Sequence, residues 1–332
     1  MKKLIHLPHA VHESTCYVNG LFDLLTWKGA DYDYFLLPVA GGMANFAYLR
    51  FKSASPPCMV YWGNSPRYLM QQLGEILGFT QIISEGKSFK HEFPRVKGYL
   101  DRDIPVMAGA LDMFYLHFYP DLYMKEHVPL HYVLVIGYDD ARRTVYVHDC
   151  SHKGVQEIPY TEFESSLNIN VPGLSRKNTY RVFTLPDKLP SELEVAEKGF
   201  SHKARHMLTP PVSMLGIPAM RKLIKEIPAW QDEGCFKHMV AYAGMTPPLI
   251  AEDLSHNDGL RFQQADLFRE LGAKYGRKQW NAAAELFRQS GEAVIELCRA
   301  ALQFDGKSCA KALTQIVDLE SAAYKLLLSD SG

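Results

Sequence analysis

The chain has 332 residues, of which 47% are hydrophobic and 22% are charged. Lys and Arg number 36 against 37 Asp and Glu, which gives a formal net charge of −1. A chain of this length and composition can bury a large core, and its length predicts two domains. Because no strong positive field is available to hold phosphates, we expect no nucleic-acid partner.

The first residues, MKKLIHLPHA, contain two lysines but no apolar stretch of the kind that a signal peptide needs. The longest apolar run, around residues 131–138, is far too short to span a bilayer, so we expect no membrane partner. The six cysteines are scattered without a CxxC pair, which argues against a zinc ribbon and against a disulfide scaffold. These features together predict a protein of the reducing cytoplasm.

The segment STCYVNGLFDLLTWKG, residues 14–29, predicts the first helix because its apolar side chains recur at helical spacing. Ser14 or Thr15 is the expected N-cap of this helix. Cys16 would then lie in the first helical turn. There, unpaired backbone N–H groups and the positive end of the helix dipole favour a thiolate.

The remainder of the first half predicts a mixture of helices and strands. The run at 131–138 is apolar at nearly every position, as expected for a strand covered on both faces. The stretch DDARR after it indicates a hairpin, with Asp139 and Asp140 as turn residues. Strands are predicted over residues 104–113, 131–140, 142–150 and 178–186, and helices over residues 68–79 and 159–167.

The pattern changes near Pro186, where residues 185–193 are rich in proline and charge and predict a linker. We therefore expect an α+β domain over residues 1–186 and an all-α domain over residues 190–332. Helical spacing recurs in the second domain over residues 218–230, 234–244, 259–276, 279–303 and 308–328.

Three residues indicate nucleophilic acyl chemistry. Cys16 lies at a helix start, His131 heads an apolar strand, and Asp149 ends the next strand. This order is that of a papain-type Cys-His-Asp site, in which a thiolate attacks, an imidazole holds the proton and a carboxylate orients the imidazole. In the predicted hairpin, His131 and Asp149 lie close enough for a bond from Nδ1–H to the carboxylate.

Simpler interpretations exist for each of these residues. A free cysteine is most often a small buried core residue, and Asp149 is otherwise a turn residue before SHKG. His127, His148 and His152 are rivals of His131 because they lie close to it in sequence. His148 alternates with Asp149, so the two side chains should point to opposite faces of the strand.

Cys150 is interpreted either as an alternating strand residue or as a neighbour of the site. The segments HESTC and HDCSH contain metal-ligand residue types, but neither has the spacing of a closed zinc site. The segment GGMANF, residues 41–46, lacks the lysine and the third glycine of a phosphate-binding loop. We therefore predict neither a metal nor a cofactor.

The segments CYVNGLFDLL, PVMAGALDMFYL and HYVLVIGYDDARRTVYVHD, together with the helical second half, resemble the butirosin biosynthesis protein H family. That family pairs a papain-like domain with a helical domain of undefined function. The first half is also similar to the C39 bacteriocin-processing peptidases, which share the Cys-His-Asp order. The family resemblance implies a papain-like fold. It also implies transfer of an acyl group from an acyl-carrier-protein thioester to a small-molecule amine.

Carried onto this chain, the resemblance implies that Cys16 attacks the thioester, His131 moves protons and Asp149 orients the imidazole. It also implies that Asp112 lines the cleft, although a polar residue at a strand end is an equally good interpretation.

Papain-like peptidases place a Gln before the Cys to hold the oxyanion, and the stretch HAVHES contains none. The backbone N–H of Cys16 can supply one oxyanion donor, and His12 or a nearby amide another. Tyr17 is among the aromatic residues expected in the wall of the cleft, with core packing as the simpler interpretation.

We expect a Cys-dependent acyltransferase. Two alternatives remain: a C39-like cysteine peptidase or amidase, and a non-catalytic papain-like binding module whose helical half serves dimerisation. A pocket for an amine would favour the transferase, and an extended groove would favour the peptidase. If all the thiols react slowly and alike with an alkylating reagent, the binding module is favoured. The sequence leaves the donor, the acceptor and the oligomeric state open, with a homodimer as one candidate.

Overall fold

The computed structural model divides into two compact units. Unit 1 comprises Met1–Tyr34 and Ser65–Pro190, and unit 2 comprises Phe35–Asn64 and Ser191–Gly332. Unit 1 mixes helices with an antiparallel sheet and unit 2 is mostly helical, which confirms the predicted succession of an α+β part and a helical part. The structure describes residues 1–12, 15–63, 65–244 and 250–329.

The division differs from the predicted one in a single segment. The change after Pro190 falls within the predicted linker, but residues 35–64 belong to unit 2 rather than to the first domain. The reason is packing. The hairpin of β2 (Met43–Arg50) and β3 (Cys58–Gly63) forms its own two-stranded sheet and packs against helices of unit 2.

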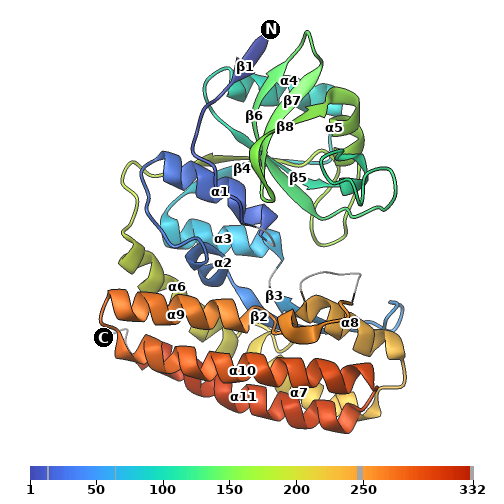
Figure 1. Ribbon diagram of the computed structural model, residues 1–332, viewed down its shortest axis with the longest axis vertical. Helices are drawn as coiled ribbons and strands as arrows, with labels where there is room; N and C mark the ends of the chain where they lie inside the picture. The colour runs from blue at the N-terminus through green and yellow to red at the C-terminus, as the bar shows by residue number, and fades with distance from the viewer. Residues whose placement is uncertain (13–14, 64, 245–249, 330–332) are drawn as a thin grey trace. The chain divides into compact units, whose positions relative to one another are not determined.

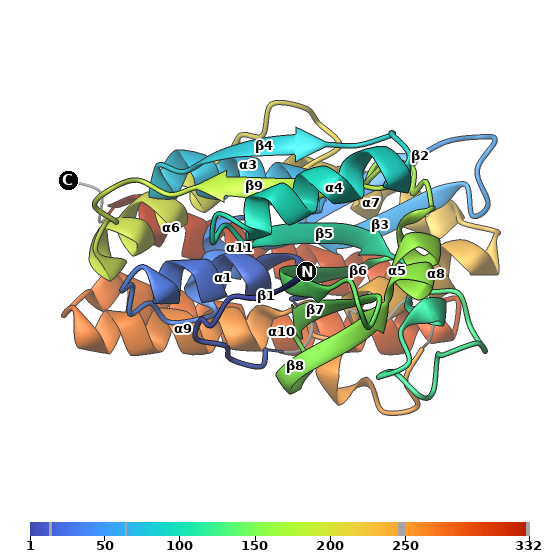
Figure 2. The ribbon, with the colours of Figure 1, turned by 90° about the horizontal axis from the view of Figure 1, so that it is seen from above.

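Unit 1 is built on a seven-stranded antiparallel sheet in the order β4-β9-β5-β6-β7-β8, with β1 paired to β6 (Figure 2). The strand β1 approaches β6 so closely that a Cβ at Gly137 would lie 2.3 Å from the backbone oxygen of Lys3. The strands are β1 (Lys2–Leu4), β4 (Thr80–Ser84), β5 (Val106–Leu111), β6 (His131–Asp139), β7 (Thr144–Asp149), β8 (His152–Pro159) and β9 (Tyr180–Thr184).

Helices cover both faces of this sheet (Figure 1). Apolar side chains of α4 and α5 share one core with Val133 and Val135 of β6. On the opposite face, α1 lies against Leu134, which fills the space beside Gly20. All nine residues of β6 are therefore buried, in agreement with its apolar sequence. The helices of unit 1 are α1 (Cys16–Trp27), α3 (Pro66–Leu77), α4 (Phe89–Leu100), η1 (Met113–Tyr115) and α5 (Tyr160–Leu167).

In unit 2, the long helices α9, α10 and α11 pack side by side (Figure 1). A capping box starts α6 inside the predicted linker, where Ser191 and Glu194 bond each other's backbone N–H. The helices are α2 (Leu36–Ala40), α6 (Glu192–Leu208), α7 (Gly216–Glu226), η2 (Ile227–Ala229), α8 (Glu233–Ala243), η3 (Leu254–His256), α9 (Arg261–Lys274), α10 (Lys278–Leu302) and α11 (Gly306–Ser329).

A fully buried ion pair lies in the core of unit 2. The Nε of Arg261 is 2.9 Å from Oε1 of Glu320, and both side chains are 0% exposed. The Ser290 hydroxyl donates to the same carboxylate oxygen at 2.8 Å. Burial removes the hydration of both charged groups, and these hydrogen bonds and the attraction between the charges offset that cost.

Replacing Glu320 with Ala should lower the free energy of unfolding by about 3–5 kcal/mol, because Arg261 would stay buried without its carboxylate. Urea unfolding measures this change. Glu296→Ala is the matched control: its pair with Arg299 is exposed, so the change should stay below about 1 kcal/mol. Equal stability of the two variants would contradict the assignment of Glu320.

None of the helices within the described residues combines the length and the apolar character needed to cross a membrane.

Candidate active site

Cys16 is the first residue of α1, as the sequence predicts. Thr15 occupies the N-cap position, but its side chain does not cap the helix; its hydroxyl donates to the carbonyl of His12 at 3.2 Å. Ser14, the other predicted N-cap, lies outside the described residues. The N–H of Val18 bonds the carbonyl of Thr15 at 2.8 Å. The N–H groups of Cys16 and Tyr17 precede the first bond of the helix, so they can serve as donors beside the Cys16 sulfur.

His131 and Asp149 lie side by side at one end of the β6–β7 hairpin. His131 Nε2 is 2.5 Å from Asp149 Oδ2, and the two side chains are 5% and 0% exposed. The predicted bond through Nδ1 is wrong. The register pairs Leu134 with His148, so His131 faces the turn after β7, and its outer nitrogen reaches the carboxylate. Nδ1 remains on the other side of the ring.

Three further donors surround the Asp149 carboxylate. Its Oδ1 accepts from the Tyr119 hydroxyl at 2.7 Å and from the Ser151 N–H at 2.9 Å, and the His152 Nδ1 lies 2.8 Å away. Burial alone would raise the pKa of Asp149, yet the hydrogen bond and charge of His131 and the hydrogen bond of His152 hold it well below its usual range. Asp149 is therefore a carboxylate at neutral pH.

The same contact acts on His131 in the opposite direction. Burial lowers the pKa of His131, but the hydrogen bond and the charge of Asp149 outweigh it and raise the pKa above 6.5. The raised pKa favours the imidazolium form of His131 beside the Asp149 carboxylate, and such a pair is the proton-holding half of a cysteine-based acyl-transfer site.

Cys150 adjoins this pair. Its sulfur and the nearest ligand atoms of His131 and Asp149 all lie within 4.8 Å of one another. The thiols of Cys16 and Cys150 are close enough that each shifts the pKa of the other. Of the two interpretations that the sequence left open for Cys150, the structure favours a neighbour of the site.

The thiol pair divides its charge unequally. The hydrogen bond with Cys16, reinforced by the charge of His131, lowers the pKa of Cys150 to about 6 despite burial. The same hydrogen bond, together with burial, raises the pKa of Cys16 well above its ordinary value. The two thiols therefore share one negative charge, with Cys150 favoured to carry it, and the ionisation of Cys16 at the helix start stays a prediction.

Cys16 lies against the start of β6. Its sulfur is 3.8 Å from the carbonyl oxygen of Leu130, the residue before His131, and it receives a hydrogen bond from the N–H of Tyr132. Cys16 is half-buried, whereas Cys150 is buried. Of the two residues, Cys16 is therefore the more exposed.

Asp112 has a local structural role. Its carboxylate accepts from the N–H of Phe114 at 3.1 Å and from the N–H of Val128 at 3.0 Å, and lies 2.6 Å from Nδ1 of His127. These contacts cap η1 and hold the loop before β6, which favours the simpler interpretation of Asp112 as a polar residue at a strand end. The contact with Asp112 also occupies His127, one of the histidines that the sequence offered as an alternative to His131.

His12 and Tyr17 make packing contacts. The ring of His12 stacks on Tyr34 with centroids 3.3 Å apart, and the backbone N–H of His12 donates to the carbonyl of Cys150 at 2.9 Å. That amide is consequently not free to hold an oxyanion. Burial lowers the pKa of His12, so its ring is neutral. Tyr17 packs edge-to-face on Tyr132 at 6.3 Å.

A pH titration of thiolate absorbance tests the thiol pair. We expect a step near pH 6 in the wild type, because the lowered pKa leaves Cys150 ionised above that pH and protonated below it. Cys150→Ala should remove the step, whereas Cys58→Ala, a buried cysteine of unit 2, should leave it unchanged. A step that persists in Cys150→Ala would assign the low pKa to another thiol.

Two family models match consecutive parts of the chain. Residues 15–150 match a family model described as "Butirosin biosynthesis protein H, N-terminal", and this range includes Cys16, His131, Asp149 and Cys150. Residues 168–327 match a second model, described as "Domain of unknown function (DUF4872)". No curated protein gives a significant match to the chain.

Proposed function

Because the chain belongs to the butirosin biosynthesis protein H family, we propose that it is a Cys-dependent acyltransferase. It would move an acyl group from a thioester to an amine through an acyl-Cys16 intermediate. The observation that carries this proposal is the 2.5 Å contact between His131 and Asp149, with Cys150 beside it and the Cys16 thiol bonded to Cys150.

In the proposed first step, Cys150 is the base. Its thiolate, paired with the His131 imidazolium, accepts the hydrogen bond of the Cys16 thiol. As the Cys16 sulfur attacks the thioester carbonyl, a new C–S bond forms and the Cys16 proton passes to Cys150. The tetrahedral intermediate then collapses, the bond to the leaving sulfur breaks, and Cys150 gives that proton to the leaving thiolate. Acyl-Cys16 and a free thiol are the products.

In the second step, an amine attacks the acyl-Cys16 carbonyl. A C–N bond forms, and the Cys16–acyl bond breaks. The amine loses one proton, which passes through the Cys150 thiolate to the departing Cys16 sulfur. This returns the site to its starting charge, with an amide released. Asp149 keeps His131 cationic throughout, so the charge beside Cys150 is compensated in both steps.

The chemistry of the site favours an activated donor over a peptide. The His12 amide is bonded to the carbonyl of Cys150, so the N–H groups of Cys16 and Tyr17 at the start of α1 are the proposed oxyanion donors. Loss of one oxyanion donor typically costs about 10²–10³ in rate. A thioester tolerates this loss better than an amide because its carbonyl is already reactive. An acyl carrier protein as the donor and a small amine as the acceptor therefore fit the proposal.

Intact-mass spectrometry with a panel of acyl thioesters, free and carrier-bound, tests the proposal. We expect the acyl mass increment on the wild type, none on Cys16→Ser, and faster loss of the increment with an amine than with water. Cleavage of peptides without any thioester adduct would replace the proposal with a peptidase. Neither adduct nor cleavage would replace it with a binding module.

A further inference from the structure

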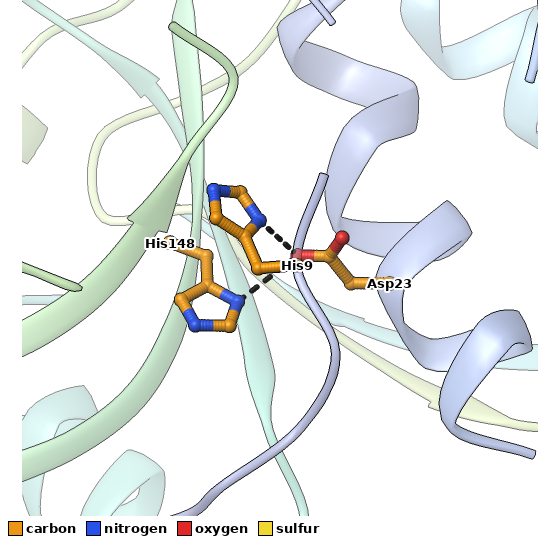
Figure 3. Close-up of side chains that lie close together, drawn as sticks. All are labelled: His9, Asp23 and His148. Carbon is orange, nitrogen blue, oxygen red and sulfur yellow. Dashed lines mark hydrogen bonds and ion pairs between the residues drawn. The ribbon is translucent and has the colours of Figure 1, made fainter. Parts of the chain in front are cut away.

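A second polar cluster lies in unit 1, formed by His9, Asp23 and His148 (Figure 3). Asp23 Oδ2 is 2.7 Å from Nδ1 of His9 and 3.0 Å from Nδ1 of His148. The side chains of His9 and His148 are each 6% exposed and that of Asp23 is 1% exposed. The three residues come from the segment before α1, from α1 and from β7.

Both ring nitrogens of His9 face hydrogen-bond acceptors. Its Nε2 is 3.1 Å from the carbonyl oxygen of Asp149 and 2.9 Å from that of His152. Carbonyl oxygens only accept, so Nε2 carries a hydrogen. Its Nδ1 faces the Asp23 carboxylate, so this nitrogen carries one too. Burial would lower the pKa of His9, but Asp23 and the two carbonyls raise it above 6.5.

A proton fits this cluster better than a metal ion does. The 2.7 and 3.0 Å separations are those of charge-assisted hydrogen bonds. Neighbouring ligands of a tetrahedral zinc would lie about 3.3 Å apart. The rings of His9 and His148 are stacked, with centroids 4.1 Å apart and planes at 26°. Both Nδ1 atoms bond the same Asp23 oxygen, so that oxygen takes the place between them that a shared ion would need.

The cluster joins the two elements that carry the proposed site. Helix α1 begins at Cys16, and Asp23 lies about two turns further along on the same face. The turn between β7 and β8 carries Cys150 and follows Asp149. His9 bonds Asp23 on the helix side and the backbone of the turn on the other side.

We propose that His9 is a positioning residue: its doubly protonated ring fixes the turn that carries Asp149 and Cys150 against the helix that carries Cys16. This inference rests on the proposed function for its catalytic consequence, but not for its structural one. We call the bonds from His9 to Asp23 and to the backbone of the turn the His9 link. His148 of β7 supports this link by bonding the same Asp23 oxygen, and its ring stacks on that of His9.

The link is sensitive to pH. The titratable groups that face the His9 ring are Asp23 from α1, His148 from β7 and His12 from its own segment. Because the pKa of His9 is raised, the link is complete below pH 6.5 and is lost as the pH rises through the raised value. In Asp149 the pKa is lowered instead, so its charge persists over this range.

Nitrogen-15 NMR of histidine-labelled protein tests the structural claim without any substrate. We expect His9 to show two protonated ring nitrogens near neutral pH, with a signal identified by its loss in His9→Gln. The downfield proton of the His131–Asp149 bond should shift or broaden in His9→Gln. His6→Gln, which changes an exposed histidine of the same segment, should leave it in place. A neutral His9 ring, or a bound zinc that shifts its Nδ1 signal, would overturn the inference.

Acylation kinetics test the catalytic claim. Misplaced groups can cost about a hundredfold in rate, so we expect His9→Gln to lower the acylation rate constant roughly ten- to a hundredfold with unchanged thioester KM. The variant should also lose the decline that the wild type shows on the alkaline side. An unchanged rate in folded His9→Gln would overturn the positioning role. Failure of the wild type to acylate would contradict the proposed function, while the NMR result would still decide the link.

Discussion

Asp149→Asn should lower the rate of acylation about 10⁴-fold, the loss that the same change causes in a serine-protease triad. In the wild type, the carboxylate stabilises the His131 imidazolium across a 2.5 Å contact. An amide in its place has no charge to offer, and its NH₂ group would face Nε2 and favour the wrong tautomer. Thioester binding should change little, because Asp149 is fully buried. Quenched single-turnover mass spectrometry measures the rate directly.

Tyr119→Phe is the matched control for this prediction. It removes one of the hydrogen bonds to Asp149 but leaves the carboxylate and His131 in place. A neutral donor contributes far less than the charge, so a loss of about tenfold or less is expected. If Asp149→Asn remained within tenfold of the wild type, His131 would not depend on this carboxylate and the triad assignment would fail.

Cys16→Ala should abolish acyl-enzyme formation, with a loss on the order of 10⁶ in rate, as for the removal of other covalent nucleophiles. Cys150→Ala should be milder, about 10²–10⁴, because it removes a base but leaves the accepting sulfur. The adduct that Cys150→Ala still forms should be on Cys16. Single-turnover rates of the two variants measure the difference.

Cys58→Ala, in unit 2, serves as the control and should acylate like the wild type. The opposite ranking, with Cys150→Ala inactive and Cys16→Ala active, would make Cys150 the nucleophile.

The strongly patterned elements of unit 1 could be predicted from sequence, and the weakly patterned ones could not. The apolar run of β6 and the helical spacing of α1 are visible because each buries a broad apolar surface. The edge strands β4 and β8 have partly exposed residues and little alternation, so neither was predicted. Helix α4 contains Pro94 and many charges, and tertiary packing of a few side chains holds it in place.

The hairpin β2–β3 shows why the domain assignment of residues 35–64 was beyond the sequence. The segment lies early in the chain, yet its buried strands find their partners among helices that follow residue 191. Contacts between residues so far apart leave no local signal. The capping box at Ser191 and Glu194, in contrast, is a local sequence pattern that could have predicted the start of a helix within the predicted linker.

The chain order of Cys16, His131 and Asp149 brought the candidate residues together in the prediction, but the residues that bond and support them were missed. His152 was treated as a rival of His131, whereas it is a further partner of Asp149. Asp23 carried a signal that could have been used, since a carboxylate two turns after Cys16 on an apolar helix needs a buried partner. The partner, His9, could not be inferred from spacing.

Mapping the acyl group to one cysteine tests the central claim most directly. After incubation with a reactive thioester and tryptic digestion at mildly acidic pH, Cys16 lies in the peptide of residues 4–28 and Cys150 in that of residues 144–153. We predict the acyl increment on the first peptide and its disappearance when an amine is added before digestion. An increment on the second peptide, or an increment on the first that no amine removes, would contradict transfer through acyl-Cys16.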